Sequence, residues 1–185
     1  MASARFMILM GVVALVAGLL PLTGCSNNTG KPSGNADTNI ESVKIDGEWF
    51  QLELALDGET RFKGLSGRDH IEPDGGMLFV FPRPNDQRFV MRDCLVPIDI
   101  IYLDPAGRIT AMHHMPVEPP RDPETEPVTG VGATDKYEQR LKRYPSRYPA
   151  QFVIELAGGT LERLDLSEGD LIDLNDPAGL KARAK

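Results

Sequence analysis

Residues 76–104 read GMLFVFPRPNDQRFVMRDCLVPIDIIYLD, and this stretch decides the fold. Its two apolar runs, residues 77–81 and residues 98–103, are rich in aromatic and β-branched side chains and have the length of strands. Such runs, separated by turn-forming residues, predict buried β-strands. Three charged residues that a plain core strand would not contain lie in the same stretch: Arg92, Asp93 and Asp99.

The chain before this stretch predicts a β-hairpin followed by a short helix. Within residues 42–56, Asp46-Gly47 is the preferred two-residue hairpin turn, because both positions require a positive φ. Apolar residues alternate with polar ones after the turn, which indicates a strand with one buried face. Asp57 is a suitable N-cap for a helix over residues 58–66.

The chain after this stretch adds further short elements. Its segments predict a strand at 108–115, a solvated loop at 116–131, a charged helix at 134–144, a strand at 151–156, a helix at 160–164 and a strand at 171–174. The pattern predicts an α+β, mainly β domain over residues 40–176. Its architecture would be a bent antiparallel sheet or small open barrel with two or three short helices. We expect residues 177–185 to form a frayed tail.

The N-terminal segment has the pattern of an export signal. A basic start at Arg5, an apolar run over residues 6–20 and small residues before a cysteine are typical of a secretory signal peptide. The apolar run is shorter than the roughly 20 residues that a spanning helix needs. Leu22-Thr23-Gly24-Cys25 resembles a bacterial lipobox, which implies cleavage after residue 24 and diacylation of Cys25.

The lipobox resemblance predicts an exported protein that is anchored by lipid to the cell envelope. Ser26 follows the lipidated cysteine. In a Gram-negative cell, this residue favours the outer membrane, on its periplasmic side. Residues 25–39 are polar, with Gly and Pro and no apolar periodicity, so they predict a flexible tether between the lipid and the domain.

Charge and cysteine content exclude several classes of function. The 185 residues have a formal net charge of -7 and a pI near 5.0. An acidic chain lacks the basic footprint that neutralises phosphates, so we expect no nucleic-acid partner. Only Cys94 remains once Cys25 is lipidated, so no intramolecular disulfide is expected. No phosphate-binding loop, zinc-type cysteine spacing or serine-hydrolase elbow is present, and we predict no cofactor.

Five ordered motifs carry a family resemblance. They are RFKGL at 61–65, GMLFVF at 76–81, FVMRD at 89–93, PIDI at 97–100 and FVIEL at 152–156. The chain is similar to the family named domain of unknown function 192, over nearly all of the predicted domain. The resemblance implies a compact β-rich single domain that is often exported and has no settled biochemical role.

Three positions depart from the pattern of that family. The family usually has Trp where this chain has Val90, Asn where it has Asp93, and Thr where it has Cys94. An aromatic ring is lost and an amide becomes an acid. A pocket built on these positions would therefore differ in polarity from its relatives.

The leading hypothesis is a non-catalytic module that binds a small ligand or an envelope protein. Arg61, Arg92, Asp93 and Asp99 would line or brace its polar site. Asp99 lies in an apolar strand, and a buried carboxylate needs a partner, for which Arg61 and Arg92 are the candidates. The alternative is a structural ion pair that fixes the register of the strands.

Two other functions remain open at this point. Asp93 and Asp99 are candidates for a carboxylate pair that does acid–base work in a hydrolase, with support from arginine. Thioether and imidazole groups suit copper, and the chain contains the run Met112, His113, His114, Met115. A strand would offer at most two of these ligands on each face, so core methionines and surface histidines are the simpler reading, and we assign no metal residue.

Overall fold

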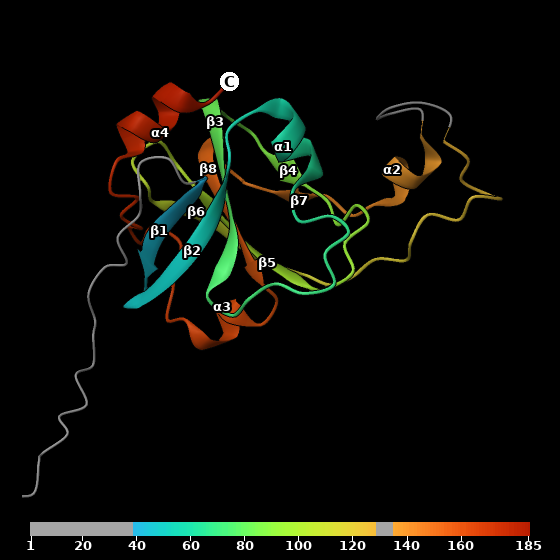
Figure 1. The fold of residues 1–185 in the computed structure, drawn as a ribbon, viewed down its shortest axis with the longest axis horizontal. Helices are drawn as coiled ribbons and strands as arrows, with labels where there is room; N and C mark the ends of the chain where they lie inside the picture. Colours follow the sequence, from blue (N-terminus) through green and yellow to red (C-terminus); the bar gives the residue numbers. More distant parts are fainter. Residues whose placement is uncertain (1–38, 129–134) are drawn as a thin grey trace, which may run out of the picture. The chain divides into compact units, whose positions relative to one another are not determined.

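The structure, a computed structural model, describes residues 39–128 and 135–185 (Figure 1). The predicted signal peptide, the predicted lipidation site Cys25 and the predicted tether up to residue 38 lie outside the described residues. Within the described part of the chain, no helix combines the length and the apolar composition needed to cross a membrane.

The fold is mainly β, as the sequence predicts. Six strands form one open sheet in the order β1-β2-β3-β8-β5-β6, and β4 pairs with β7 separately. Because β1 and β6 remain as edges, the sheet does not close into a barrel. The strands are β1 (Ile40–Ile45), β2 (Glu48–Ala55), β3 (Gly75–Asn85), β4 (Arg88–Phe89), β5 (Ile98–Leu103), β6 (Ile109–Met115), β7 (Tyr144–Pro145) and β8 (Ala150–Ala157). The described residues also form four short helices, α1 (Gly58–Lys63), α2 (Lys136–Arg140), α3 (Thr160–Arg163) and α4 (Pro177–Arg183).

One strand pair departs from the antiparallel arrangement that the sequence suggests. β2 and β3 run parallel, with Leu54 opposite Leu78. The intervening residues 56–74 contain α1 and carry the chain back to the end of the sheet where β2 began. Parallel neighbours require a crossover of this kind, whereas antiparallel ones are joined by a tight turn. The sheet is therefore mixed rather than antiparallel throughout.

Local signals place the first elements correctly. Asp46 and Gly47 have φ values of 44° and 83°, which confirms the predicted hairpin turn between β1 and β2. Asp57 caps α1, because its Oδ1 accepts a hydrogen bond of 2.9 Å from the backbone N–H of Thr60. The helix ends at Lys63, earlier than predicted.

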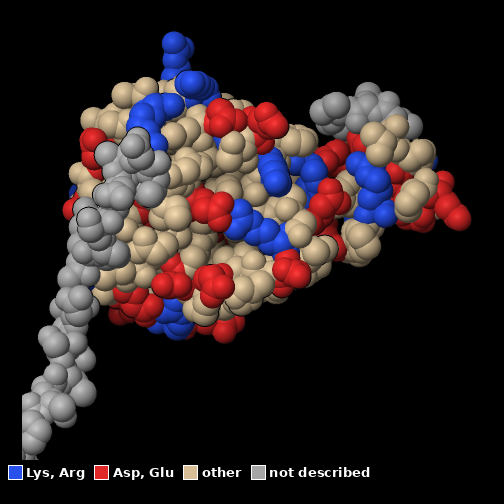
Figure 2. Space-filling model, viewed as in Figure 1, with Lys and Arg blue, Asp and Glu red and all other residues tan. Residues whose placement is uncertain are grey.

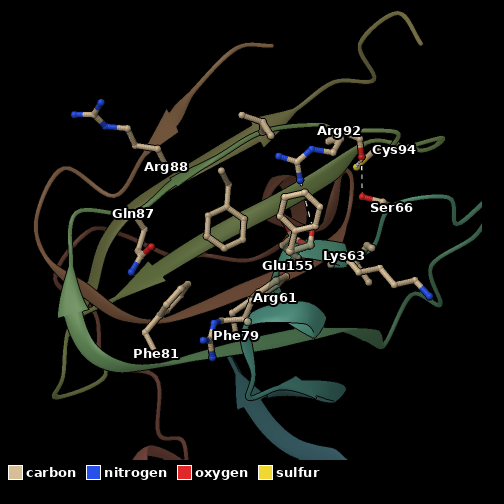
Figure 3. Close-up of a pocket in the computed structure, with 16 residues that line it drawn as sticks. Arg61, Lys63, Ser66, Phe79, Phe81, Gln87, Arg88, Arg92, Cys94 and Glu155 are labelled. Carbon is tan, nitrogen blue, oxygen red and sulfur yellow. Dashed lines mark hydrogen bonds between the residues drawn. The ribbon is translucent and has the colours of Figure 1, made fainter. Parts of the chain in front are cut away.

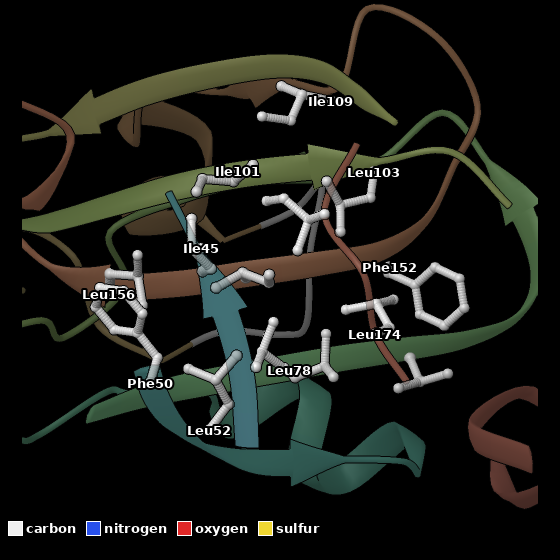
Figure 4. Packing of buried hydrophobic residues seen from close by; sticks show 14 of the residues in the cluster. Ile45, Phe50, Leu52, Leu78, Ile101, Leu103, Ile109, Phe152, Leu156 and Leu174 are labelled. Atoms are coloured by element: carbon white, nitrogen blue, oxygen red, sulfur yellow. The ribbon is translucent and has the colours of Figure 1, made fainter. Parts of the chain in front are cut away.

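The sheet has an apolar core on each face. One cluster joins the inward residues of β1 and β2 to the middle of the sheet and to the C-terminal segment, and Figure 4 shows part of it. The other cluster lies on the opposite face of β3, β5 and β8, where Leu65, Met91 and Tyr144 cover it. Alternation along each central strand explains the division, since neighbouring side chains point to opposite faces. On β8, for example, Ile154 belongs to the first cluster and Val153 to the second.

The C-terminal residues do not form the frayed tail that we predicted. Residues 177–183 form α4, with proline in the first turn and Asp176 as the N-cap. Leu180 is buried in the first core cluster, and this apolar contact holds the helix against the sheet. The preceding segment makes only an isolated bridge between Leu171 and Arg108 instead of the predicted strand at 171–174.

Candidate functional site

A cavity of about 310 Å³ lies on the second face of the sheet, beside α1 (Figure 3). Its walls come from α1 and the residues after it, from β3, β4 and β8, and from the loop that follows β4. Apolar side chains form much of the wall and polar ones the remainder. The residues that surround it are Gly58, Arg61, Phe62, Lys63, Gly64, Leu65, Ser66, Phe79, Phe81, Gln87, Arg88, Phe89, Val90, Arg92, Cys94 and Glu155.

Among the described residues, Glu155 is the one acidic side chain that lines this cavity. It lies on β8 and is only 5% exposed. Burial raises the pKa of its carboxyl to about 8, although the positive charge of Arg68 opposes the shift. No described residue donates a hydrogen bond to this carboxyl group. Among the described residues, the one fully buried side-chain oxygen or nitrogen without a partner is the hydroxyl of Tyr144, so the oxygens of Glu155 are accessible from the cavity. An acid with a shifted pKa in a cavity marks a candidate binding site.

Gly64 allows the end of α1 to approach this acid. The residue has φ 51° and ψ -137°, a backbone conformation that favours glycine. A Cβ atom at this position would lie 3.7 Å from Oε2 of Glu155 and 3.4 Å from the ring of Phe79. The glycine therefore brings the helix end close to the acid without a side chain between them.

Arg61 lies at the cavity but does not pair with Asp99. Its guanidinium donates hydrogen bonds to three backbone carbonyls, those of Leu56 at 2.8 Å, Val80 at 2.9 Å and Lys185 at 2.6 Å. Burial lowers its pKa. The side chain therefore ties α1 to β3 and to the C-terminal end, and its predicted role as a partner of Asp99 is wrong.

Arg92 also reaches the cavity and is paired with another residue. Its Nε and Nη2 donate to the two carboxylate oxygens of Glu138 on α2, and this hydrogen-bonded pair raises the pKa of Arg92. The guanidinium lies 4.2 Å from the ring centre of Phe62. Arg92 thus joins α1, α2 and the loop after β4 instead of pairing with Asp99 as predicted.

Of the four cationic side chains that the described residues place at the cavity, Lys63 and Arg88 make neither a salt bridge nor a side-chain hydrogen bond. Both are exposed. No hydrogen bond or ion pair links either side chain to another residue within 39–128 and 135–185. Their charged ends lie on opposite sides of the cavity and point away from it (Figure 3).

Asp93 does not lie on a strand face, contrary to our expectation. β4 ends at Phe89, and Asp93 takes a left-handed conformation with φ 51° in the loop that follows. The hydroxyl of Tyr137 donates to its Oδ1 at 3.0 Å and accepts from its backbone N–H at 2.9 Å. Asp and Asn both tolerate this conformation. The backbone thus explains why either residue suits the position.

Asp99 is fully buried, as predicted, but away from the cavity. Its Oδ2 accepts a hydrogen bond from the backbone N–H of Leu161 at the start of α3, and its Oδ1 lies 2.7 Å from Nδ1 of His114. On β5, Asp99 shares its face with Ile101 of the first core cluster, whereas the loop that holds Asp93 covers the second. The structure therefore does not bring Asp93 and Asp99 together as a carboxylate pair.

The Met112–Met115 run is divided between the two faces of β6. Met112 packs with the first core cluster and Met115 with the second. Nε2 of His113 lies 2.8 Å from the carbonyl of Pro145, and His114 contacts Asp99. Among the described residues, no group of three His, Cys, Asp or Glu side chains is placed to hold a metal ion. The four residues do not converge on one copper site.

Glu155, the acid of the cavity, was not predicted from the sequence. A usable signal was present, because Glu155 stands between Ile154 and Leu156 in an apolar strand, as Asp99 stands between two isoleucines. The same rule on buried carboxylates applied to both. Lys63 and Arg88 gave no such signal, since exposed basic residues are common.

A family model described as "Uncharacterized ACR, COG1430", DUF192, matches residues 41–174. The chain belongs to this family. No curated protein matches the chain.

Two solved structures resemble this member of DUF192. One is described as a "putative transcription regulator" from Sinorhizobium meliloti 1021; it is 27% identical, with a TM-score of 0.55, over 71% of this chain and 89% of that one. The other is a protein of unknown function from Novosphingobium aromaticivorans DSM 12444, 21% identical with a TM-score of 0.53, over 72% of this chain and 83% of that one. The second likeness shows the fold alone.

Proposed function

We propose that this DUF192 chain is a non-catalytic module that binds a small ligand in the cavity beside α1. The observation that carries the proposal is Glu155, a buried acid that lines the cavity with no hydrogen-bond partner among the described residues. The phenylalanines around it supply an apolar wall, and the cavity is near the lower end of the size range of small-molecule pockets. A few polar groups in an apolar cavity are what orients a small ligand.

The potential nucleophiles at the cavity favour binding over catalysis. Burial raises the pKa of the Cys94 thiol to about 12, so little thiolate exists at neutral pH. The hydroxyl of Ser66 donates to the backbone carbonyl of Arg92 at 2.7 Å. A nucleophilic hydroxyl or thiol needs an adjacent base, and no histidine lines the cavity within the described residues.

We further propose that the module is exported and anchored to the cell envelope through lipid on Cys25. The lipobox-like ending of the N-terminal segment supports this proposal. In a Gram-negative cell, the outer membrane would carry the protein on its periplasmic side. Metabolic labelling with a palmitate analogue tests the anchor. We expect label in the natural chain and none in Cys25→Ser, and equal labelling of both would overturn it.

A nucleic-acid role is not part of the proposal, although one structural relative is described as a regulator of transcription. The chain has a net charge of -7. Figure 2 shows acidic and basic side chains interspersed over the face in view, with no continuous basic surface there. Binding to a phosphate backbone depends on such a surface.

Filling the cavity tests the binding role. Val90 lines the cavity, and Val90→Trp restores the aromatic residue that is usual at this position, so the variant should fold. We expect protein purified gently from envelopes to carry an organic adduct in native mass spectrometry, and Val90→Trp to lack it. Val128→Trp is the matched control, because Val128 is 78% exposed and away from the cavity.

Either of two results would contradict the proposal. An adduct of equal mass and occupancy in Val90→Trp would mean that the ligand lies elsewhere. The absence of any adduct from the natural chain and from Val128→Trp, together with no binding of added small molecules, would mean that the cavity is not a binding site.

A further inference from the structure

Resting on the proposed binding role, we propose that the ligand is an uncharged molecule with an apolar body and an amide or lactam group. The carbonyl oxygen of this group accepts a hydrogen bond from the carboxyl group of Glu155, and its N–H donates one to the other carboxyl oxygen. Three features of the cavity carry this inference: the unpaired acid, the directions of the charged side chains around it, and the aromatic wall beside it.

Glu155 presents a donor and an acceptor side by side. Burial raises the pKa of its carboxyl to about 8, so the group is mostly protonated at pH 7. In this form it has one O–H donor and a second oxygen that accepts. None of the described residues makes a hydrogen bond to either oxygen, and both oxygens are accessible from the cavity. Both are therefore open to a ligand.

An amide edge satisfies the two oxygens at once. A ligand that covers the carboxyl group excludes water from it, and a buried donor or acceptor without a partner costs free energy. A ketone or ether oxygen can only accept, so it leaves the second oxygen of Glu155 unpaired. A primary amide or a lactam carries a C=O and an N–H next to each other, so it pairs with the O–H and with the other oxygen.

The cations around the cavity offer no site for an anionic ligand. Arg61 donates its hydrogen bonds to backbone carbonyls, and Arg92 is paired with Glu138. The charged ends of Lys63 and Arg88 point away from the cavity on opposite sides (Figure 3). An anion that entered the cavity would thus lose its hydration without gaining a cationic partner, which is costly.

A cationic ligand is disfavoured as well. It would have to ionise Glu155, and burial of this carboxyl opposes the charged form. The guanidinium of Arg68 is close enough to act on Glu155 through its charge, and both carboxylate oxygens of Glu53 hold it in place, at 2.5 and 2.8 Å. This fixed positive charge repels a second cation beside Glu155. We therefore expect an uncharged ligand.

The wall accounts for the apolar body of the ligand. Phe79 and Phe89 meet edge to face with their ring centres 4.9 Å apart, and aromatic surfaces of this kind pack well against a ring. The ring of Phe79 and Oε2 of Glu155 would lie 3.4 and 3.7 Å from a Cβ atom at Gly64. The wall and the acid therefore adjoin, and one small ligand can contact both. A volume of about 310 Å³ limits its size.

Four probes that share one ring test the class of ligand. They are benzamide, acetophenone, benzoate and benzylamine, each titrated at pH 7 by saturation-transfer NMR against the full-length protein in mild detergent, with detergent alone as the blank. Acetophenone has nearly the shape of benzamide and keeps the carbonyl, but its methyl group cannot donate. We expect benzamide to bind about fivefold more tightly than acetophenone, because one more hydrogen bond contributes about 1 kcal/mol. Benzoate and benzylamine should bind more weakly than either.

Removing the carboxyl group assigns this preference to Glu155. Glu155→Leu places an apolar side chain of similar size in a buried strand, so the variant should fold, which circular dichroism checks. The fivefold preference should disappear, with benzamide and acetophenone bound equally well. Glu162→Leu is the matched control, because Glu162 is exposed and outside the cavity, and it should keep the preference.

A pH titration of the natural chain gives a second measurement. As the pH rises from 7 to 9.5, Glu155 ionises and loses its O–H donor, so acetophenone, which can only accept, should lose affinity at least fivefold. Glu155→Leu should show no such loss, and it leaves the other charged and titratable groups around this position in place. These groups are Glu53 of β2, Arg61 and Lys63 of α1, Arg68 after it, Arg88 of β4, Arg92 and Cys94 of the following loop, and Tyr102 of β5.

The outcomes separate this inference from the binding role on which it rests. Tighter binding of benzoate or benzylamine than of benzamide, equal binding of benzamide and acetophenone by the natural chain, or a preference that survives in Glu155→Leu would overturn the amide inference and leave the cavity as a binding site. An acetophenone affinity that stays constant to pH 9.5 would do the same. Binding of the probes that is unchanged in Val90→Trp, or binding of none of them, would overturn both.

Discussion

Replacing the buried acid Glu155 with glutamine should stabilise the folded protein at neutral pH. The carboxyl has its pKa raised from 4.5 to about 8 by burial. Below pH 4.5 it is protonated in both the folded and the unfolded chain, so it has no effect on stability. Between pH 4.5 and 8 the unfolded chain ionises while the folded chain keeps the proton, so the free energy of unfolding falls as the pH rises.

The size of this effect follows from the shift. At pH 7, the unfolded chain is about 2.5 pH units above the ordinary pKa of its glutamate, which corresponds to roughly 3 kcal/mol at 1.36 kcal/mol per unit. Glutamine has nearly the same shape and does not ionise. Glu155→Gln should therefore raise the free energy of unfolding at pH 7 by up to about 3 kcal/mol, or the melting temperature by roughly 6–12 °C for a domain of this size.

Urea unfolding at several pH values between 4.5 and 8.5 measures the effect directly. The natural chain should lose stability across this range relative to Glu155→Gln, and the two should converge near pH 4.5. Glu162→Gln on α3 is the control, because Glu162 is exposed and its replacement should leave the pH profile unchanged. The reasoning is refuted if Glu155→Gln is no more stable than the natural chain at pH 7, or if the two profiles are parallel.

Three further substitutions probe the contacts described above. Arg92→Met leaves the carboxylate of Glu138 buried without its partner and should lower the free energy of unfolding by roughly 2–4 kcal/mol in chemical unfolding. A double variant with Glu138→Leu should regain part of this loss. Additive losses from the two substitutions would argue against the pair. Asp99→Ala leaves the N–H of Leu161 unpaired and should lower the free energy of unfolding by roughly 2–3 kcal/mol. Asp99→Asn can still accept this hydrogen bond, so it should lower the free energy of unfolding by only about 1 kcal/mol. Equal losses would show that the bond to Leu161 does not matter for stability. Cys94, with its pKa near 12, should react with iodoacetamide at pH 8 on the order of a thousandfold more slowly than a free thiol, as followed by peptide mass spectrometry; rapid labelling of the folded protein would show an accessible thiolate.

Local rules in the sequence predicted much of the fold. The Asp46-Gly47 turn and the Asp57 cap depend on residues close in the chain, and both are present. The parallel pairing of β2 with β3 could not be read in this way, because it depends on the path of the crossover. α4 was missed because its stability comes from the burial of Leu180 against a distant part of the chain.

The site was harder to predict than the fold. The apolar neighbours of Asp99 in its strand correctly predicted that it is buried. The rule that a buried carboxylate needs a partner could not identify that partner. Arg61 and Arg92 found nearer acceptors in backbone carbonyls and in Glu138. Such choices depend on distances across the folded chain, which periodicity does not encode. Arg61 and Arg92 both line the cavity, and their part in ligand binding stays a prediction.

The place of β8 in the sheet has a consequence for how the protein matures. β8 joins two halves of the sheet, β1 to β3 on one side and β5 with β6 on the other, because it lies between β3 and β5 and hydrogen-bonds to both. Until this late segment of the chain is inserted, the halves have no backbone contact through the sheet. Closing such distant pairings is slow compared with forming local ones. β8 also carries Glu155, so under the proposed binding role a chain caught before this step would lack the acid of the cavity.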